Sequence, residues 1–410
     1  MARILAYTSP ARGHLFPIVP VLGELRRRGH EVALRTLSSQ VSLMRSLGFD
    51  AARINDRVEL IEHDDWRARG PRGALTRAVR CFSARARFDG PDLRQAIAQE
   101  RPDALLVDIN SWGALAAAEA WDGPWTAFCP YPLALRSRDG PPFGPGLRPA
   151  RGTLGRARDR VVGPLVMGTL ERAMLPALNR VRADMGLDEL TDVDSMFHRP
   201  PLLLYFTAEP FEYPRRDWPE NLLMVGPCDW EPPGETPAWL EEARPPIVLV
   251  TTSSEFQSDE RLVRVALDAL AGDRLTVIVT VPATDPRRFE APANARVVRY
   301  VPHGPVLDRA VCAVTHGGMG VTQKALARGV PVCAVPFGRD QLEVARRVEV
   351  AGAGSRLPAS RLRSDRLRAK IRAAMLKAEG ARRVAAGFES AGGPKAAADA
   401  IERRLAAAGG

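Results

Sequence analysis

The sequence predicts an α/β protein built from two doubly wound, Rossmann-like domains. Its 410 residues are too many for one ordinary hydrophobic core and suit two. In both halves of the chain, short apolar runs alternate with helical segments, a pattern typical of parallel sheets covered by helices. A linker at residues 227–246, which contains the runs Pro232-Pro233-Gly234 and Pro245-Pro246, separates the two halves.

The first domain, residues 1–226, opens with a strand at Ile4–Tyr7, a turn at residues 8–14 and a helix expected at Pro17–Arg28. A second strand follows at Val32–Thr36. This opening lacks the glycine pattern of a dinucleotide fingerprint, which argues against a nicotinamide cofactor.

Residues 50–99 show an irregular pattern, with a mixed helix near Ala74–Phe88. The cluster His63-Asp64-Asp65-Trp66 could suggest a metal site. However, one histidine beside two adjacent carboxylates lacks the spacing that places ligands on one face of an element. We therefore expect a solvated loop at this cluster.

The rest of the first domain supplies strands, helices and long loops. The expected elements are strands at 104–107, 125–129, 202–206 and 222–225, helices at 111–120 and 155–185, and a loop at 130–151. The helix at 155–185 carries apolar residues between arginines. It could form a membrane-surface face, but lining of an apolar acceptor cleft or packing on the core is favoured. We expect the loops of this domain to hold the acceptor and set specificity.

The second domain, residues 247–392, is expected to begin with an apolar strand and to alternate strands with helices. The expected elements are strands at 247–250, 275–281 and 296–301 and a helix at 260–270. A C-terminal helix, residues 393–410, can pack back on the first domain.

The most informative stretch lies in this second domain. A strand at Val311–Thr315 leads into the glycine-rich turn His316–Gly320, which is followed by a helix at Val321–Arg328 and a strand at Val332–Val335. Glycines allow the backbone to approach a ligand closely. A turn that feeds a helix N-terminus offers unpaired N–H groups and the positive end of the helix dipole, which suits a phosphate.

Asp340 and Gln341 follow the next strand, so we expect them at the same carboxyl edge of the sheet. An anion cradle beside an acid–amide pair suggests a nucleotide-sugar, with pyrophosphate at the helix and sugar hydroxyls at Asp340 and Gln341. Ser253 and Ser254 follow another strand and could contact phosphate or simply cap a helix. The candidate donor-binding residues are Ser253, Ser254, Val301, His316, Gly317, Gly318, Gly320, Thr322, Asp340 and Gln341.

His14 is the candidate catalytic residue of the first domain. It follows the first strand, and Asp108 ends a later strand, so parallel pairing would place both at one edge of the sheet. A carboxylate there could orient the imidazole and stabilise its protonated form. The alternative interpretation is a helix-capping or core histidine.

The second-domain motif resembles the donor-binding signature of the GT-B-fold glycosyltransferases that act on small molecules. The bacterial antibiotic or macrolide branch is the more similar one, and the plant UDP-glycosyltransferases are related to it. The residues that match the signature are His316, Gly318, Gly329, Pro331, Asp340 and Gln341. Positions that depart from it are Tyr300, His303, Val321 and Lys324.

This resemblance implies the GT-B architecture, in which two Rossmann-like domains face a cleft. It implies an inverting, metal-independent glycosyltransferase that needs no cofactor. The sugar, expected to be a deoxysugar, would pass from a TDP- or UDP-sugar to a hydroxyl of an apolar natural-product aglycone. His14 would be the general base and Asp108 its partner. The alternatives are a non-catalytic glycosyltransferase-like partner protein, a nucleotide-sugar epimerase and a lipid-linked sugar transferase of the same fold.

Composition limits the partners and the compartment. The formal net charge is +10, but arginines are spread along helices with carboxylates between them, so we expect no nucleic-acid partner. The five cysteines are not closely spaced and cannot all pair, which fits a reducing compartment. The chain enters a strand at once and lacks a long apolar segment. We therefore expect a cytoplasmic monomer or homodimer that is not an integral membrane protein.

Overall fold

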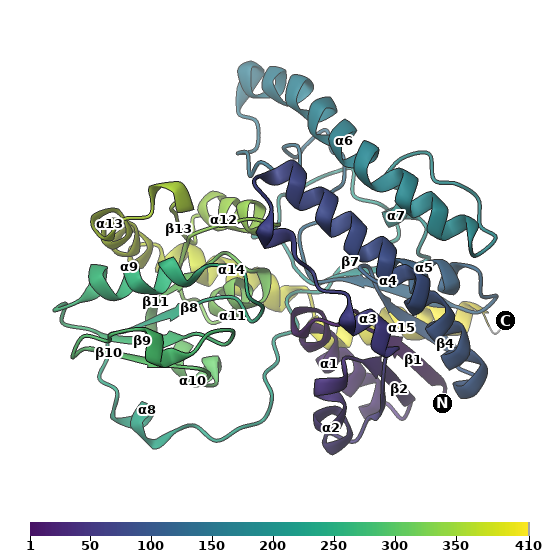
Figure 1. Ribbon diagram of the computed structural model, residues 1–410, viewed down its shortest axis with the longest axis horizontal. Helices are drawn as coiled ribbons and strands as arrows, with labels where there is room; N and C mark the ends of the chain where they lie inside the picture. Colours follow the sequence, from purple (N-terminus) through teal and green to yellow (C-terminus); the bar gives the residue numbers. More distant parts are fainter. Residues whose placement is uncertain (409–410) are drawn as a thin grey trace.

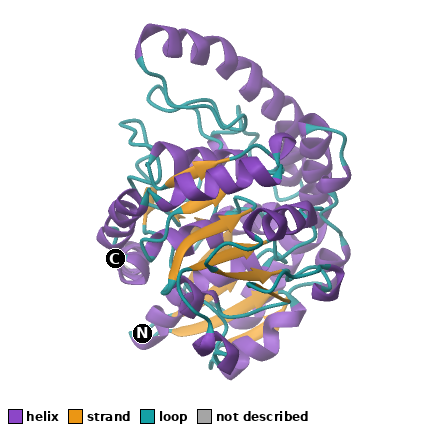
Figure 2. Cartoon of the chain, turned by 90° about the vertical axis from the view of Figure 1, so that its left-hand side faces the viewer, coloured by secondary structure: helices purple, strands orange, loops and turns teal. Residues whose placement is uncertain are grey.

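The computed structural model describes residues 1–408 and contains two parallel sheets, each with helices on both faces (Figures 1 and 2). The first sheet has the strand order β3-β2-β1-β4-β5-β6-β7. Its strands are β1 (Arg3–Tyr7), β2 (Glu31–Thr36), β3 (Asp50–Arg53), β4 (Ala104–Asp108), β5 (Trp125–Cys129), β6 (Leu203–Tyr205) and β7 (Leu222–Met224). The helices of this domain are α1 (Arg12–Arg27), α2 (Ser38–Ser46), α3 (Asp56–Leu60), α4 (Pro71–Glu100), α5 (Trp112–Glu119), α6 (Gly152–Ala183) and α7 (Ser195–His198).

The second sheet has the order β10-β9-β8-β11-β12-β13. Its strands are β8 (Ile247–Thr251), β9 (Thr276–Thr280), β10 (Ala295–Val298), β11 (Ala310–Thr315), β12 (Val332–Ala334) and β13 (Gly354–Arg356). The helices that follow the first domain are α8 (Ala238–Glu242) in the linker, α9 (Glu260–Leu270), α10 (His303–Leu307), α11 (Met319–Ala327), α12 (Gln341–Val350), α13 (Ser364–Met375), α14 (Ala378–Ser390) and α15 (Gly393–Ala408).

Each central strand is buried on both faces because helices cover the sheet on both sides. In β1, Leu5 and Tyr7 join one hydrophobic core and Ile4 and Ala6 join the other. A parallel strand buried in this way is continuously apolar, which is why these runs stand out in the sequence. The two-domain α/β architecture predicted from the sequence is confirmed.

For residues 50–99, the helix predicted near Ala74–Phe88 is confirmed as part of a longer one, but the irregular pattern expected for the rest was wrong. This segment contains a strand, a short helix and α4, a continuous helix of 30 residues. Its apolar positions are diluted by arginines, and Pro91 lies inside the helix. Helix α1 also begins five residues earlier than expected, so His14 lies in its first turn and Pro17 and Pro20 lie within it.

The C-terminal helix α15 lies against α1 of the first domain (Figure 1). Ala397, Ala398 and Ile401 are buried in the core beneath β1, and Arg28 of α1 forms ion pairs with Asp399 and Glu402. Residues 409 and 410 of the expected helix lie outside the described part of the chain.

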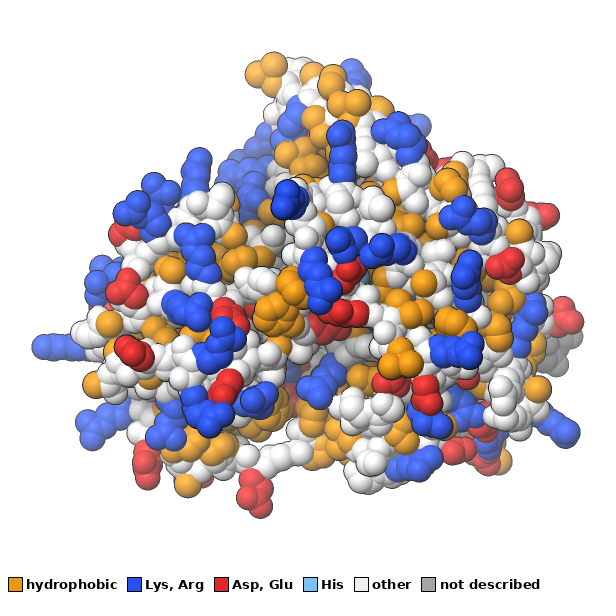
Figure 3. All heavy atoms as spheres, in the orientation of Figure 1, with side chains coloured by type: hydrophobic (Ala, Val, Ile, Leu, Met, Phe, Trp, Pro, Cys, Tyr) orange, Lys and Arg blue, Asp and Glu red, His pale blue; other side chains and the backbone are white. Residues whose placement is uncertain are grey.

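Helix α6 projects from the body of the protein (Figure 1). Leu154, Val161 and Leu165, near its first half, are exposed, and hydrophobic side chains gather over its projecting end (Figure 3). By length and composition alone, α6 is the one helix within residues 1–408 that could cross a membrane. Its second half packs on the first-domain core through Ala177, Leu178 and Val181.

Candidate active site

The carboxyl ends of β1 and β4 form the first half of the site. The two strands are neighbours in the sheet, so the residues that follow them meet at one edge. Asp108 is the last residue of β4, and His14 lies in the first turn of α1, directly after β1. The sheet order therefore brings together two residues that are 94 positions apart in the sequence.

His14 Nδ1 lies 2.9 Å from Asp108 Oδ1. The buried carboxylate also accepts hydrogen bonds from Ser9 N (3.0 Å), Ser9 Oγ (2.7 Å) and Asn110 N (2.9 Å). Burial opposes the ionisation of Asp108, but His14 and these hydrogen bonds outweigh it and lower its pKa. Burial also opposes a charge on His14, but the Asp108 carboxylate outweighs it and raises the pKa of the imidazole.

Asn110 and Tyr131 complete the surroundings of His14. Asn110 Nδ2 lies 3.2 Å from His14 Nε2, and the Tyr131 hydroxyl donates to Asn110 Oδ1 at 2.7 Å. Because Nδ1 donates to Asp108, Nε2 carries the lone pair and accepts from the asparagine amide. The imidazole is thus held in the tautomer whose outer nitrogen can take a proton. Asn110 was not predicted from the sequence, although its place two residues after Asp108 was a signal.

The turn between β11 and α11 forms the second half of the site. Gly317 adopts a φ of +86°, and a Cβ on Gly318 would lie 2.3 Å from His316 Nε2. Only glycine therefore lets the chain fold this closely around the imidazole. His316 is buried, and within residues 1–408 its Nδ1 has no hydrogen-bond partner. Burial and the charge of Arg339 lower its pKa to about 4, so the ring is neutral at physiological pH.

Two hydroxyls among the predicted donor contacts are engaged within the protein. Thr322 Oγ1 is buried and lies 3.3 Å from Thr315 Oγ1. Ser253 Oγ accepts hydrogen bonds from Glu255 N (3.2 Å) and Gln257 Nε2 (2.8 Å). The hydroxyls of Thr322 and Ser253 therefore hydrogen-bond to other groups of the protein in this structure. Of the other predicted residues, Ser254 and Gly320 are exposed and Val301 is buried.

Gln341 holds the turn that follows β12. Its Oε1 accepts from Phe337 N (2.8 Å) and Gly338 N (3.1 Å), and its Nε2 donates to Gln257 Oε1 (2.5 Å). We expected the Gln341 side chain to contact sugar hydroxyls, but its Oε1 accepts hydrogen bonds from the backbone of its own turn.

Asp340 is the predicted donor residue that directly precedes α12. Burial raises its pKa, and the positive charges of Arg339 and His14 act against this rise. His14 in turn feels the charge of Asp340. The charges of the candidate base and the candidate sugar-binding carboxylate therefore influence one another, although the two residues come from different domains.

Lys324 ties the donor helix to the linker. Its Nζ lies 3.0 Å from Asp229 Oδ1 and 2.9 Å from Glu231 Oε1. Glu231 also accepts from the backbone N–H groups of His303 (2.7 Å) and Gly304 (2.9 Å). Lys324, which departs from the family signature, thus forms ion pairs with two carboxylates of the linker.

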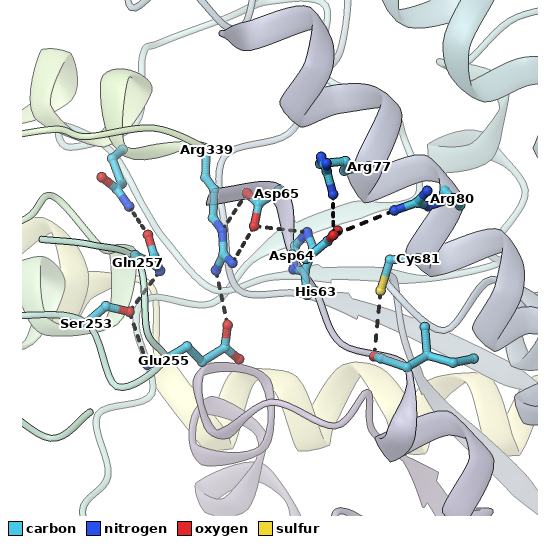
Figure 4. A network of polar contacts seen from close by, with 12 residues as sticks. His63, Asp64, Asp65, Arg77, Arg80, Cys81, Ser253, Glu255, Gln257 and Arg339 are labelled. Carbon is cyan, nitrogen blue, oxygen red and sulfur yellow. Dashed lines mark hydrogen bonds and ion pairs between the residues drawn. The ribbon is translucent and has the colours of Figure 1, made fainter. Parts of the chain in front are cut away.

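The cluster at His63–Trp66 is not a solvated loop, and this prediction was wrong. Asp65 is buried and forms an ion pair with Arg339 of the second domain (Figure 4). The sequence could not show this pairing because the two residues are 274 positions apart. Across residues 1–408, no group of three or more His, Cys, Asp or Glu side chains is arranged to hold a metal ion.

Comparison with known proteins identifies the family. The chain is 34% identical over 391 residues to the 4'-demethylrebeccamycin synthase of Lentzea aerocolonigenes, an alignment that covers 91% of this chain and 92% of that protein. The chain belongs to the antibiotic glycosyltransferases of the GT-B family. Residues 264–403 of this glycosyltransferase match the family described as erythromycin biosynthesis protein CIII-like, C-terminal domain.

Solved structures confirm the GT-B fold of the glycosyltransferase. The calicheamicin glycosyltransferase CalG4 superposes with a TM-score of 0.73 at 22% identity, over 99% of this chain and 98% of that one. The glycosyltransferase VinC, solved in complex with DTDP, superposes with a TM-score of 0.70 at 19% identity, over 98% and 99% of the two chains. The expected arrangement of two Rossmann-like domains is therefore the fold of this enzyme.

Proposed function

We propose that this glycosyltransferase moves a sugar from a thymidine or uridine diphosphate sugar to a hydroxyl of an apolar natural product, with inversion. The observation that carries the proposal is the hydrogen-bonded pair His14–Asp108, which lies close enough to Asp340 of the donor side for their charges to interact. The relative named 4'-demethylrebeccamycin synthase supports a natural-product acceptor. The VinC structure with DTDP supports a thymidine nucleotide.

In the proposed reaction, the acceptor hydroxyl replaces the Asn110 amide at His14 Nε2. Nε2 takes the hydroxyl proton while the oxygen attacks the anomeric carbon, and Asp108 stabilises the resulting imidazolium. The bond between the anomeric carbon and the diphosphate oxygen breaks, and its electron pair leaves on that oxygen. Attack from the face opposite the diphosphate inverts the configuration.

The leaving diphosphate would bind at the turn that contains His316. There the first turn of α11 offers unpaired backbone N–H groups and the positive end of the helix dipole. The His316 imidazole in this turn would supply a further polar contact. We propose that these groups stabilise the developing charge without a metal ion.

We assign the sugar hydroxyls to Asp340. Because Gln341 is engaged in its own turn, Asp340 is the remaining polar side chain of the acid–amide pair. We propose a deoxysugar as the transferred sugar because the resemblance to the antibiotic branch implies one. We further propose that the enzyme acts in the cytoplasm as a monomer or homodimer, which size-exclusion chromatography with light scattering would distinguish.

The test combines binding with turnover. Calorimetry with thymidine and uridine diphosphate, with and without a chelator, should show binding of one nucleotide that the chelator leaves unchanged. A panel of TDP- and UDP-sugars with polycyclic and macrocyclic aglycones, analysed by mass spectrometry, should reveal a glycosylated product. His14→Ala should abolish that product and leave nucleotide binding within about twofold. Near-normal turnover of His14→Ala would reject the base assignment.

A further inference from the structure

Arg339 joins the two domains beside the candidate donor site. Its Nε and Nη2 donate to Asp65 at 2.9 and 2.7 Å, and its Nη1 donates to Glu255 at 3.1 Å (Figure 4). Asp65 belongs to the first domain, whereas Arg339 and Glu255 belong to two loops of the second. Both oxygens of the Asp65 carboxylate are used, which is the two-point geometry that arginine forms with carboxylates.

The loops that Arg339 connects flank the proposed diphosphate site. In the second sheet, β11 lies between β8 and β12, so the turn that contains His316 lies between the loops that follow those two strands. Residues 252–259 follow β8, and residues 335–340 follow β12. Gln257 donates to Ser253 of its own loop (Figure 4). It also accepts a hydrogen bond from Gln341, the residue that follows the second loop.

A second contact joins the same first-domain loop to the second domain. The rings of Trp66 and Phe256 meet edge to face, with centroids 4.9 Å apart. The ion pair Asp65–Arg339 and the aromatic pair Trp66–Phe256 thus hold residues 63–67 against the carboxyl edge of the second sheet. Arg339 also has a φ of +53°, a left-handed conformation that is rare for arginine. Such a conformation persists where the surrounding contacts fix it, and Arg339 precedes Asp340 directly.

We propose that Asp65 is a positioning residue for sugar transfer. By binding Arg339, Asp65 holds the first-domain loop 63–67 against the carboxyl edge of the second sheet, where the donor is proposed to bind. The same ion pair fixes the turn that carries Asp340. Asp65 acts here through Arg339 and does not touch the substrate. The inference rests on the proposed donor site. It means that a residue of the first domain helps to set the geometry of the donor site in the second domain.

The first experiment measures hydrogen–deuterium exchange in the full chain and in Asp65→Asn, which keeps the shape of the side chain but removes its charge. We expect exchange in the second-domain segments 252–259 and 336–342 to become at least tenfold faster, although the substitution is in the first domain. Arg287→Gln is the control, because Arg287 is exposed and, within residues 1–408, forms an ion pair only with Asp285 of its own domain. Unchanged exchange of both segments in Asp65→Asn would overturn the proposal.

The second experiment separates positioning from stability through kinetics, with the donor and acceptor identified by the panel. Asp65→Asn should lower kcat/KM about ten- to hundredfold, the loss expected for a two-point charged hydrogen bond. Its affinity for thymidine or uridine diphosphate should stay within threefold. Arg339→Lys, which keeps the charge but not the two-point contact, should retain intermediate activity. It also replaces Asp65→Asn if that variant does not fold. A kcat/KM within threefold of wild type in both variants rejects the role.

These outcomes are distinguishable from failure of the donor site itself. If wild-type enzyme binds neither thymidine nor uridine diphosphate, the donor assignment fails, whatever the exchange rates show. If wild-type enzyme binds one of them and Asp65→Asn transfers sugar normally, only the positioning role fails.

Discussion

At the scale of single residues, the chemistry of the site depends on what surrounds His14. Asp108 binds Nδ1 and favours the charged imidazole, whereas Asn110 donates to Nε2 and favours the neutral one. The charged groups that face His14 from the other domain are Glu255 and Asp340. The balance between these groups sets the pH at which His14 can act as a base.

Replacing Asp108 with asparagine should change both the rate and its pH dependence. The carboxylate raises the pKa of His14, and protonated His14 cannot act as a base, so the acid limb of kcat/KM should move to lower pH in Asp108→Asn. The rate on the plateau should fall by about 10²–10⁴-fold, the usual contribution of acid–base catalysis. Rate profiles between pH 5 and 9 would test this. An acid limb that moves upward would contradict the assigned hydrogen bond.

Replacing Asn110 should shift the same limb the other way. Asn110→Ala removes a donor that stabilises the neutral imidazole, and Asn110→Asp places a second carboxylate near Nε2. We therefore expect the pKa of His14 to rise in the order wild type, Asn110→Ala, Asn110→Asp. NMR titration of the His14 ring measures this without any substrate. Equal pKa values in the three proteins would show that Asn110 does not control the base.

At the scale of elements, the close packing of the turn between β11 and α11 makes it sensitive to one methyl group. Gly318→Ala would place a Cβ 2.3 Å from His316 Nε2, so the ring or the turn must move. We expect the affinity for the nucleotide diphosphate to fall by roughly tenfold or more. Gly23→Ala in α1 is the matched control, because a Cβ there meets nothing within 4 Å. Calorimetry on both variants would decide, and equal affinities would reject the proposed site.

Except for β3 and β13, the strands could be predicted from sequence because buried parallel strands are continuously apolar, and the turn containing His316 could be predicted because glycine turns are distinctive. Helix α9 was predicted with its observed bounds, Glu260–Leu270, since its apolar residues recur at helical spacing. Helix α4 was predicted only in part, near Ala74–Phe88, because its arginines interrupt this periodicity. The pairing of Asp65 with Arg339 was missed because it depends on how the domains meet, for which local sequence carries no signal.

At the scale of the whole molecule, a buried ionic network also joins the two domains. The loop before α6 donates from Gly144 N (2.7 Å) and Gly146 N (2.8 Å) to Glu343 Oε1 on α12. Glu343 pairs with Arg347, whose guanidinium also lies 2.9 Å from Glu212 of the first domain. Together with the junction at Arg339, this network holds the two domains in contact.

Removing the central cation of this network should destabilise the protein strongly. Arg347→Met leaves the carboxylates of Glu212 and Glu343 buried without their charged partner, a change that costs about 3–5 kcal/mol of unfolding free energy. Arg383→Met is the control, because its pair with Glu379 is exposed and worth little. Urea unfolding of the three proteins at pH 7 would measure the difference.

The pH dependence of that difference follows from Glu212. In the wild type, burial raises its pKa, but Arg347 and Arg215 outweigh burial, so the folded pKa lies below the ordinary 4.5. Its stabilising contribution is therefore present above pH 4.5 and is lost below it. Without Arg347, burial should dominate and raise the folded pKa, so that the penalty grows as the pH rises above 4.5. The difference in unfolding free energy between wild type and Arg347→Met should thus become smaller from pH 8 to pH 5. A difference that stays constant would show that water or Arg215 compensates the Glu212 charge.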